Sequence, residues 1–327
     1  MRVGIIGTGG MGNVHARHYA RMTDVQLFAF DQDTAKLEGF ANTHGATGVA
    51  SFEALLDAVD VLDICLPTHL HREYSLQAFA AKKALLLEKP MARTVAECRE
   101  LVAAADAAGV PFGVAHVVRY FPEHNLAHRL VKQGQVGTTA AVRMRRGGKA
   151  PVGSDRWFED AGKSGGVILD LAIHELDWLR WTLGEVTQVY ARSVCLGSRV
   201  EGAQFSGDYA LITLTFESGA VGHVEATWMD PAGFRTTFEI AGSGGLIEFD
   251  SRENASLRLA TEAGTRAEGN FADHDDPYYR QAKGFLDAVR SGSPVPVSGR
   301  DGLAAVAIAE AAIQSAESGL PVTPERE

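Results

Sequence analysis

The chain has 327 residues, of which 46% are hydrophobic and 22% are charged, and its formal net charge is −10. This length exceeds one ordinary hydrophobic core, so two domains are expected. The acidic balance argues against a nucleic-acid-binding protein, which would present a basic face. The three cysteines have no paired spacing and no apolar stretch is long enough to cross a membrane. We therefore expect a cytoplasmic protein with no disulfide framework and no membrane partner.

Residues 3–6 form a short apolar stretch that predicts a strand, and a glycine-rich loop and a helix reaching Met22 follow it. The loop reads Gly7-Thr8-Gly9-Gly10-Met11-Gly12. A G-x-G-x-x-G pattern between a strand and a helix predicts a dinucleotide-binding loop, although a turn without a ligand is the plainer alternative. In such a loop Gly7 permits the tight turn, Gly9 admits a pyrophosphate and Gly12 lets the helix pack on the strand. The free N–H groups of the helix N-terminus would bind the phosphates.

A second predicted strand, residues 25–30, ends at Asp31, which lies 19 residues after Gly12. At this spacing a carboxylate can bond the ribose hydroxyls of a dinucleotide. Asp31 would also repel a 2′-phosphate, and no arginine follows it in Gln32-Asp33. NAD is therefore favoured over NADP.

Helices and strands continue to alternate, with helices at 33–43, 51–56, 70–81 and 94–108 and strands at 59–66, 84–87 and 110–118. This alternation predicts a doubly wound parallel sheet. Ligands bind at the carboxyl ends of such strands, so Leu66, Pro67, Thr68 and His71 are predicted to border the cofactor. Thr68 could cap the helix at 70–81. His69 and His71 could form a metal pair, but we favour capping and packing because no third ligand is nearby.

The strand at 84–87 ends in Glu88-Lys89-Pro90, where Pro90 fixes the direction of the exit. Glu88 and Lys89 would then also border the cofactor. The ammonium of Lys89 could bond a substrate oxygen and stabilise it as negative charge develops. A solvated lysine at a strand end is the plainer alternative.

The second half begins with a helix at 121–133 and a strand at 138–146 that carries Arg143, Arg145 and Arg146. We favour a solvated strand face for these arginines over an anion site. The polar segment 147–166 reads as a loop in which Asp155 and Trp157 could form a substrate wall or an oligomer contact. Strands at 186–195, 206–216, 220–229, 234–241 and 246–249 predict an antiparallel sheet with one face open to a partner. Helices at 277–290 and 302–318 close the chain.

Between these strands lies a predicted helix that starts after Gly165-Gly166 and stops at Gly184, with an apolar face through Val167, Leu171, Trp178 and Trp181. Asp170 and His174 are four residues apart and share one face. A carboxylate beside an imidazole could move a proton at neutral pH, although a helix-surface ion pair is the plainer reading.

Five features in this order resemble the Gfo/Idh/MocA oxidoreductases. They are the glycine loop, Asp31, the Pro67-Thr68 to His71 loop, Glu88-Lys89-Pro90, and the helix with Gly165-Gly166, Asp170, His174 and Asp177. The resemblance runs nearly end to end. We therefore expect an N-terminal Rossmann domain over 1–118 that binds NAD, and a C-terminal α+β domain over 119–327 with an open, predominantly antiparallel sheet for substrate binding and oligomerisation. The active site is expected between them.

The resemblance implies hydride transfer to NAD from a secondary hydroxyl of a cyclic polyol or sugar. His174 would be the general base, Lys89 would stabilise the oxygen, and Asp170 would orient the reacting groups. Arg119, Asp155 and Trp157 are further predicted substrate contacts, and a homodimer or homotetramer is expected. Phe234 stands where a polar aromatic residue would be expected for an inositol substrate.

Three alternatives stay open at this stage. Some members of the family use NAD transiently in elimination or glycoside cleavage, without net reduction. The chain could also be a non-catalytic NAD sensor. A metal enzyme is disfavoured because Asp170 and His174 have no evident third ligand, and no metal is expected.

Overall fold

The structure is a computed structural model that describes all residues except 152, 197–206, 254–256, 269–275 and 327. The chain divides into two compact units. The first comprises Met1–Val117 and Asp275–Leu303, and the second comprises Val118–His274 and Ala304–Glu327. The segment that returns to the first unit is a departure from the expected division at residue 118.

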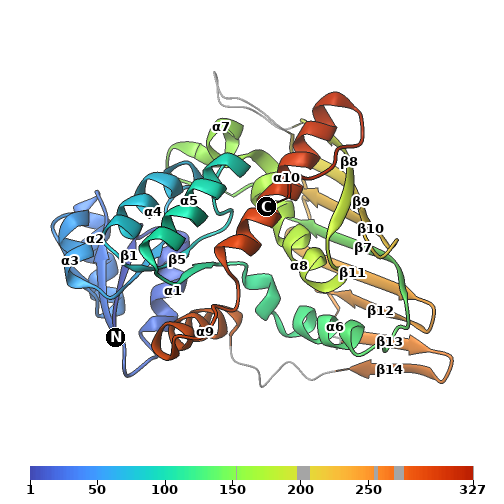
Figure 1. Ribbon diagram of the computed structural model, residues 1–327, viewed down its shortest axis with the longest axis horizontal. Coiled ribbons are helices and arrows are strands. Elements are labelled where there is room, and N and C mark those ends of the chain that lie inside the picture. Colours follow the sequence, from blue (N-terminus) through green and yellow to red (C-terminus); the bar gives the residue numbers. More distant parts are fainter. Residues whose placement is uncertain (152, 197–206, 254–256, 269–275, 327) are drawn as a thin grey trace. The chain divides into compact units, whose positions relative to one another are not determined.

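The first unit is built on a six-stranded parallel sheet (Figure 1) with the order β3-β2-β1-β4-β5-β6. Its strands are β1 (Arg2–Ile6), β2 (Gln26–Phe30), β3 (Thr47–Gly48), β4 (Val61–Ile64), β5 (Ala84–Leu87) and β6 (Phe112–Val114). The strands β1, β4 and β5 are almost continuously apolar and buried, as expected for a sheet covered on both faces. The expected Rossmann fold is confirmed, and the strand order reverses between β1 and β4.

The helices of this unit are α1 (Gly10–Tyr19), α2 (Thr34–His44), α3 (Phe52–Ala58), α4 (His71–Ala80), α5 (Val95–Ala108) and α9 (Pro277–Ser291). Side-chain caps start two of them, since Ser51 caps α3 and Thr94 caps α5. The helix α9 returns to this unit because its apolar side packs on α1 and on β6, where the ring of Phe285 fills the space beside Gly113. The last helix, α10 (Gly299–Ser318), passes from the first unit into the second after Leu303.

The second unit contains an eight-stranded mixed sheet with the order β14-β13-β12-β11-β7-β10-β9-β8 (Figure 1). Its strands are β7 (Thr139–Gly147), β8 (Val186–Val194), β9 (Tyr209–Phe216), β10 (Val221–Thr227), β11 (Arg235–Gly242), β12 (Gly245–Asp250), β13 (Leu257–Thr261) and β14 (Gly264–Glu268). Only the β7–β10 pair is parallel among the described strand pairs of this sheet. The expected open, mostly antiparallel sheet is therefore confirmed, although β13 and β14 were not predicted.

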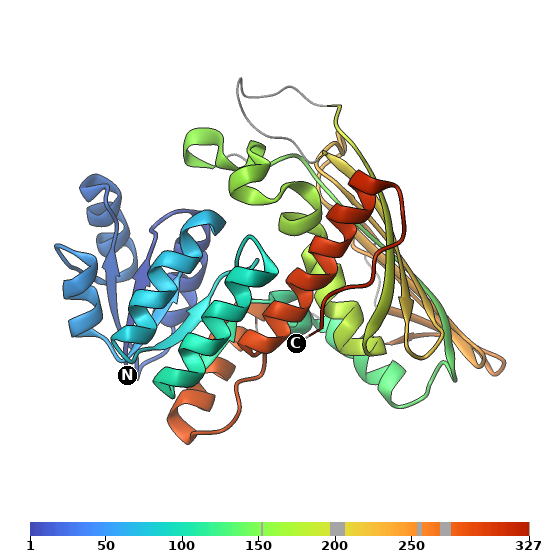
Figure 2. The same ribbon diagram turned by 45° about the horizontal axis from the view of Figure 1, so that its top comes forward.

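One face of this sheet is covered by α6 (Pro122–Lys132), α8 (Ile173–Leu183) and the later part of α10 (Figure 2). Alternate residues of β7, β9, β10 and β11 are buried beneath them. The indole N–H of Trp178 on α8 donates to the backbone oxygen of His124 on α6. The segment expected to be a loop at 147–166 in fact contains two short helical pieces, η3 (Ser154–Glu159) and α7 (Ala161–Ser164).

Candidate active site

The glycine loop has the geometry that phosphate binding requires. Gly7 has a φ of +92°, and a Cβ there would lie 2.7 Å from the backbone oxygen of Cys65. A Cβ on Gly12 would lie 2.0 Å from the oxygen of Gly7, so α1 packs directly on the loop. A Cβ on Gly9 or Gly10 would meet nothing within 4 Å. Among the described residues, no side chain caps the N-terminus of α1, so its first N–H groups could bind an anionic phosphate group.

Asp31 is fixed beside this loop at the end of β2. One carboxylate oxygen accepts hydrogen bonds from the backbone N–H and the hydroxyl of Thr8, at 2.9 and 2.7 Å. The other oxygen accepts from the N–H of Asp33 at 2.9 Å. Asn13, which the sequence reading missed, closes the loop by donating to the backbone oxygens of Thr8 and Gly9. The arrangement suits the predicted contact of Asp31 with ribose.

The loop after β4 differs from its prediction at Thr68. This residue lies in a 3₁₀ turn, η1 (Thr68–Leu70), and its side chain does not cap α4. His71, the first residue of α4, is buried with its ring nitrogens 2.9 Å from the backbone oxygen of Pro90 and 2.8 Å from that of Leu66. Burial lowers the pKa of His71, while these carbonyl contacts oppose the shift. His71 therefore joins the loops that follow β4 and β5, and its predicted cofactor contact stays a prediction.

The residues at the end of β5 alternate between buried and accessible side chains. Glu88 is buried, and one of its carboxylate oxygens accepts the backbone N–H of Lys89 at 3.0 Å. Lys89 itself is partly exposed between buried Glu88 and buried Pro90. The backbone of Lys89 is thus held by Glu88, and its predicted contact with a substrate oxygen stays a prediction.

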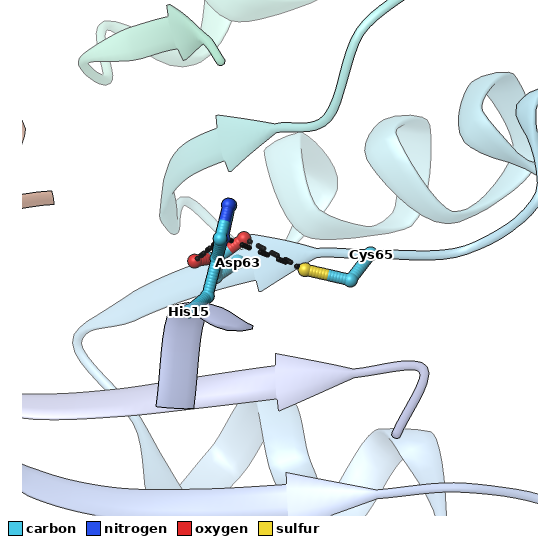
Figure 3. A group of neighbouring side chains, drawn as sticks. All are labelled: His15, Asp63 and Cys65. Carbon is cyan, nitrogen blue, oxygen red and sulfur yellow. Dashed lines mark hydrogen bonds and ion pairs between the residues drawn. The ribbon is translucent and has the colours of Figure 1, made fainter. Parts of the chain in front are cut away.

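A buried polar cluster behind this edge was not found by sequence reading. His15 on α1 points towards Asp63 and Cys65 on and after β4 (Figure 3). Nδ1 of His15 lies 2.9 Å from a carboxylate oxygen of Asp63, which also accepts the hydroxyl of Tyr19 at 2.8 Å. The Cys65 thiol lies 3.4 Å from the other oxygen of Asp63. Asp63, the one charged residue of the apolar strand β4, is thus the acceptor at the centre of this cluster.

The atoms of His15, Asp63 and Cys65 that could bind a metal lie within 4.8 Å of one another. In the structure, hydrogen bonds already join these atoms. Burial and then the charge of Asp63 raise the pKa of the Cys65 thiol, which agrees with the hydrogen bond that this thiol donates to Asp63. We therefore interpret the cluster as a hydrogen-bonded network.

In the second unit, the helix expected from Gly165 onward begins differently. Gly165 and Gly166 both have positive φ values, +84° and +67°. The next six residues, Val167–Ala172 (η4), form a π-helix before α8 begins. This corrects the expected α-helical period, since Leu171 is partly exposed while residues 167–170 are all buried. Short π-helical segments are rare and often lie at functional sites.

The predicted proton-transfer residues lie on either side of this helical transition. Asp170 is 5% exposed within the π-helix, and His174 is partly exposed in the first turn of α8. The residues on either side of His174, Ile173 and Glu175, are 0% and 1% exposed. His174 is thus a partly exposed residue between two buried neighbours, and its predicted role as a general base stays a prediction.

Two buried ion pairs hold α8 in place. Arg119 donates to both carboxylate oxygens of Asp177 at 2.8 and 2.5 Å, with both side chains buried. Arg146 donates to Glu175 at 2.7 Å. These contacts give Asp177 a partner within the unit, and the predicted contact of Arg119 with substrate stays a prediction.

The three clustered arginines of β7 do not share one solvated face, because Arg146 is buried. Arg143 and Arg145 point to the side of the sheet away from the helices, where Arg143 pairs with Glu239 and Arg145 pairs with Glu225. Arg146 points to the opposite, buried side. The pleat of the strand separates neighbours that the sequence placed together.

Of the predicted substrate wall, Trp157 is described in full and its ring stacks on Phe158 at a centroid distance of 3.8 Å. The side chain of Asp155 lies outside the described residues. Across the described part of the chain, no helix is both long and apolar enough to span a membrane.

The fold and these residues define a dinucleotide-binding oxidoreductase with a separate α/β unit. The chain belongs to the Gfo/Idh/MocA oxidoreductase family. The family's NAD-binding Rossmann fold matches residues 1–116, and its C-terminal alpha/beta domain matches residues 128–323.

Individual relatives and structures agree with this assignment. The inositol 2-dehydrogenase of Rubrobacter xylanophilus is 30% identical, over 98% of this chain and 92% of its own. The myo-inositol 2-dehydrogenase of Thermotoga maritima is 28% identical, over 97% of this chain and 96% of its own. The structure is also similar to levoglucosan dehydrogenase in complex with NADH and levoglucosan, with a TM-score of 0.91, 26% identity and full coverage of both chains.

Proposed function

We propose that the protein is an NAD-dependent dehydrogenase that oxidises a secondary hydroxyl of a cyclic polyol or sugar. The observation that supports this most directly is the exposure of two side chains. Lys89 and His174 are each partly exposed between buried neighbours, in the two positions where the resemblance predicts an oxygen-stabilising ammonium and a general base. Asp31 beside the glycine loop supports NAD as the dinucleotide.

The proposed steps assign one task to each group. His174 accepts the proton of the substrate hydroxyl, and Asp170 orients the hydroxyl or the imidazole. Lys89 bonds the same oxygen and stabilises the charge that develops on it. Bound NAD supplies the hydride acceptor. The glycine loop, the N-terminus of α1 and Asp31 would hold the dinucleotide by its pyrophosphate and ribose.

The substrate class is proposed from the relatives. Two inositol dehydrogenases and a levoglucosan dehydrogenase are similar to this chain over almost its whole length. All three names denote polyhydroxylated ring compounds. Phe234 carries no hydroxyl and is 63% exposed, which weakens the expectation of inositol itself and keeps sugar derivatives in the proposal.

The experiment is NADH formation by the purified protein against a panel of inositols, aldoses, anhydro sugars and acidic or amino sugars. Sustained NADH formation with one class is expected. Lys89→Ala and His174→Ala should each lower kcat by about a hundred- to a thousand-fold or more while NAD still binds. Lys36→Ala, at an exposed lysine of α2, is the matched control and should keep the wild-type rate.

The outcomes of this panel separate the alternatives. A single burst of NADH, with product formed but no further reduction of NAD, would mean that the enzyme uses NAD in a closed redox cycle and does not carry out a net oxidation. NAD binding with no product from any substrate would favour a sensor. Normal turnover by the Lys89 variant would refute the role given to that lysine.

We also propose that the sheet face away from the helices is the surface through which the protein forms a homodimer or homotetramer. This face carries paired charges on β7, β10 and β11 together with Leu211 and Val221, which are 41% and 42% exposed. Leu211→Glu should reduce the mass measured by light scattering to that of a smaller species. An unchanged mass would place the subunit contact elsewhere.

A further inference from the structure

His15 connects two strands of the first unit through its two ring nitrogens. The ring is 2% exposed, and Nδ1 lies 2.9 Å from Asp63 of β4. Nε2 lies 3.1 Å from a carboxylate oxygen of Glu88, which follows β5, without the alignment of a full hydrogen bond. One imidazole on α1 therefore faces carboxylates from the ends of both β4 and β5.

The surroundings of His15 favour a charged ring. Burial alone would lower the pKa of His15, but the charge and hydrogen bonding of Asp63 outweigh it and raise that pKa well above the ordinary value. Two buried carboxylates would be costly without such a cation between them. Tyr19 and Cys65 complete the hydrogen bonding of Asp63, and the ring of Tyr278 on α9 lies 6.2 Å from that of His15.

The contacts of Glu88 extend this connection to Lys89. One carboxylate oxygen of Glu88 faces His15, and the other accepts the backbone N–H of Lys89 at 3.0 Å. The helix that carries His15 begins at Gly10 in the glycine loop. A continuous set of contacts thus runs from the dinucleotide-binding helix through His15 and Glu88 to the backbone of Lys89.

We propose that His15 is a positioning residue, which holds the Glu88 carboxylate and thereby fixes the backbone of Lys89 relative to the glycine loop. The cluster lies at the carboxyl ends of the central strands, beside the point between β1 and β4 where the strand order reverses and where ligands bind in such sheets. The kinetic part of this inference rests on the proposed dehydrogenase function. The structural part, which is the placement of the Lys89 backbone, is independent of that function.

Two substitutions separate the two contacts of the ring. In His15→Asn the amide can take the place of Nδ1 and donate to Asp63, while the contact with Glu88 is lost. In His15→Gln the longer side chain can take the place of Nε2 and donate to Glu88. Asp63 then keeps its hydrogen bonds from Tyr19 and Cys65. Both variants remove the charge, so a difference between them weighs the contact with Glu88 against the contact with Asp63.

His18→Asn is the matched control for the removal of a buried histidine from α1. His18 is 4% exposed and pairs with Asp276 at 3.2 Å, next to α9 rather than to the strand ends. The control should lower the melting temperature without changing the reactivity of Lys89. The readouts are kcat, KM, NAD affinity by titration, and the acetylation rate of Lys89 followed by peptide mass spectrometry, which needs no substrate.

We expect His15→Asn to lower kcat at least tenfold and to change the acetylation rate of Lys89 at least threefold, with KM changed less. At a similar melting temperature, His15→Gln should keep both kcat and the acetylation rate of Lys89 clearly closer to the wild-type values than His15→Asn does. Equal effects of the two variants would overturn the inference. So would a stoichiometric metal ion that is bound by the wild type and lost in Cys65→Ser. If the wild type oxidises no substrate, the proposed function fails, but the acetylation rates still test the placement of Lys89.

Discussion

Removing the carboxylate of Asp177 is expected to destabilise the second unit strongly. Arg119 and Asp177 form a bidentate ion pair with side chains that are only 5% and 1% exposed. The guanidinium carbon of Arg119 also lies 5.4 Å from the centre of the Trp181 ring, so the cation is packed as well as paired. Breaking a buried pair from one side leaves an uncompensated charge, which typically costs about 3–5 kcal/mol. We therefore expect Asp177→Leu to lower the free energy of unfolding by that amount.

The double variant Arg119→Met/Asp177→Leu provides the critical comparison. Replacing a buried ion pair by apolar residues of similar volume is often neutral or stabilising. The double variant should therefore recover most of the loss, ending within about 1 kcal/mol of the wild type. Glu217→Gln is the surface control, because its pair with Arg326 is more than half exposed on both sides and exposed pairs contribute about 1 kcal/mol or less.

Tryptophan fluorescence during urea unfolding measures this effect selectively. All four tryptophans, Trp157, Trp178, Trp181 and Trp228, belong to the second unit. The reasoning would be refuted if Asp177→Leu lowered the free energy of unfolding by less than about 1 kcal/mol. It would also be refuted if the loss in the double variant equalled the sum of the losses in the two single variants. The same variants test the predicted substrate contact of Arg119. A stable double variant with an unchanged KM would exclude that contact.

Three further predictions concern the first unit. Asp31→Ser with Gln32→Arg should shift the preference from NAD toward NADP, measured as the ratio of kcat/KM values, and an unchanged ratio would mean that Asp31 does not face the ribose. Gly9→Ala should weaken NAD binding and leave the melting temperature nearly unchanged, whereas Gly12→Ala should lower the melting temperature, because its Cβ would lie 2.0 Å from a backbone oxygen. The pKa of His15 is raised in the folded state. The charged His15 therefore stabilises the fold fully at a pH below its pKa in the unfolded chain, and this stabilisation is lost as the pH rises through its pKa in the folded protein. The stability deficit of His15→Gln, measured by circular dichroism in urea, should therefore be larger at about pH 6 than at about pH 9, and a deficit that grows with pH would contradict this.

The sequence predicts well those features that depend on neighbouring residues. The glycine loop, Asp31 and Glu88-Lys89-Pro90 each lie at the end of a strand whose apolar run is evident, so their placement at one edge of a parallel sheet follows from the alternation alone. The Rossmann fold was predicted from the alternation of helices and strands, and the open sheet was predicted from the series of successive strands in the second half of the chain. The binding and catalytic roles of these residues stay predictions.

Features that depend on distant residues or on an unusual backbone were missed. His15 and Asp63 are 48 residues apart and meet only because β1 and β4 are neighbours in the sheet. Arg145 and Arg146 are adjacent in sequence but point to opposite faces of β7. The π-helix at 167–172 was read as α-helix because almost all of its residues are buried, so no exposed stripe reveals its period. The strands β13 and β14 have only five residues each, and β14 is mostly polar, which hides their pattern.

The distribution of these residues suggests how one fold serves different substrates. Lys89 and His174 lie at a strand end and in a helix, and buried contacts hold both segments through Glu88 and through the ion pairs of Glu175 and Asp177. The residues that would contact the rest of a substrate, such as Trp157 and Phe234, lie outside regular α-helices and strands. Changes in such segments disturb little of the core, so substrate preference can vary while the proposed reacting groups keep their places. We therefore expect the hydride-transfer groups to be common to relatives that differ in substrate, and the substrate of this chain to depend mainly on the segments around Trp157 and Phe234.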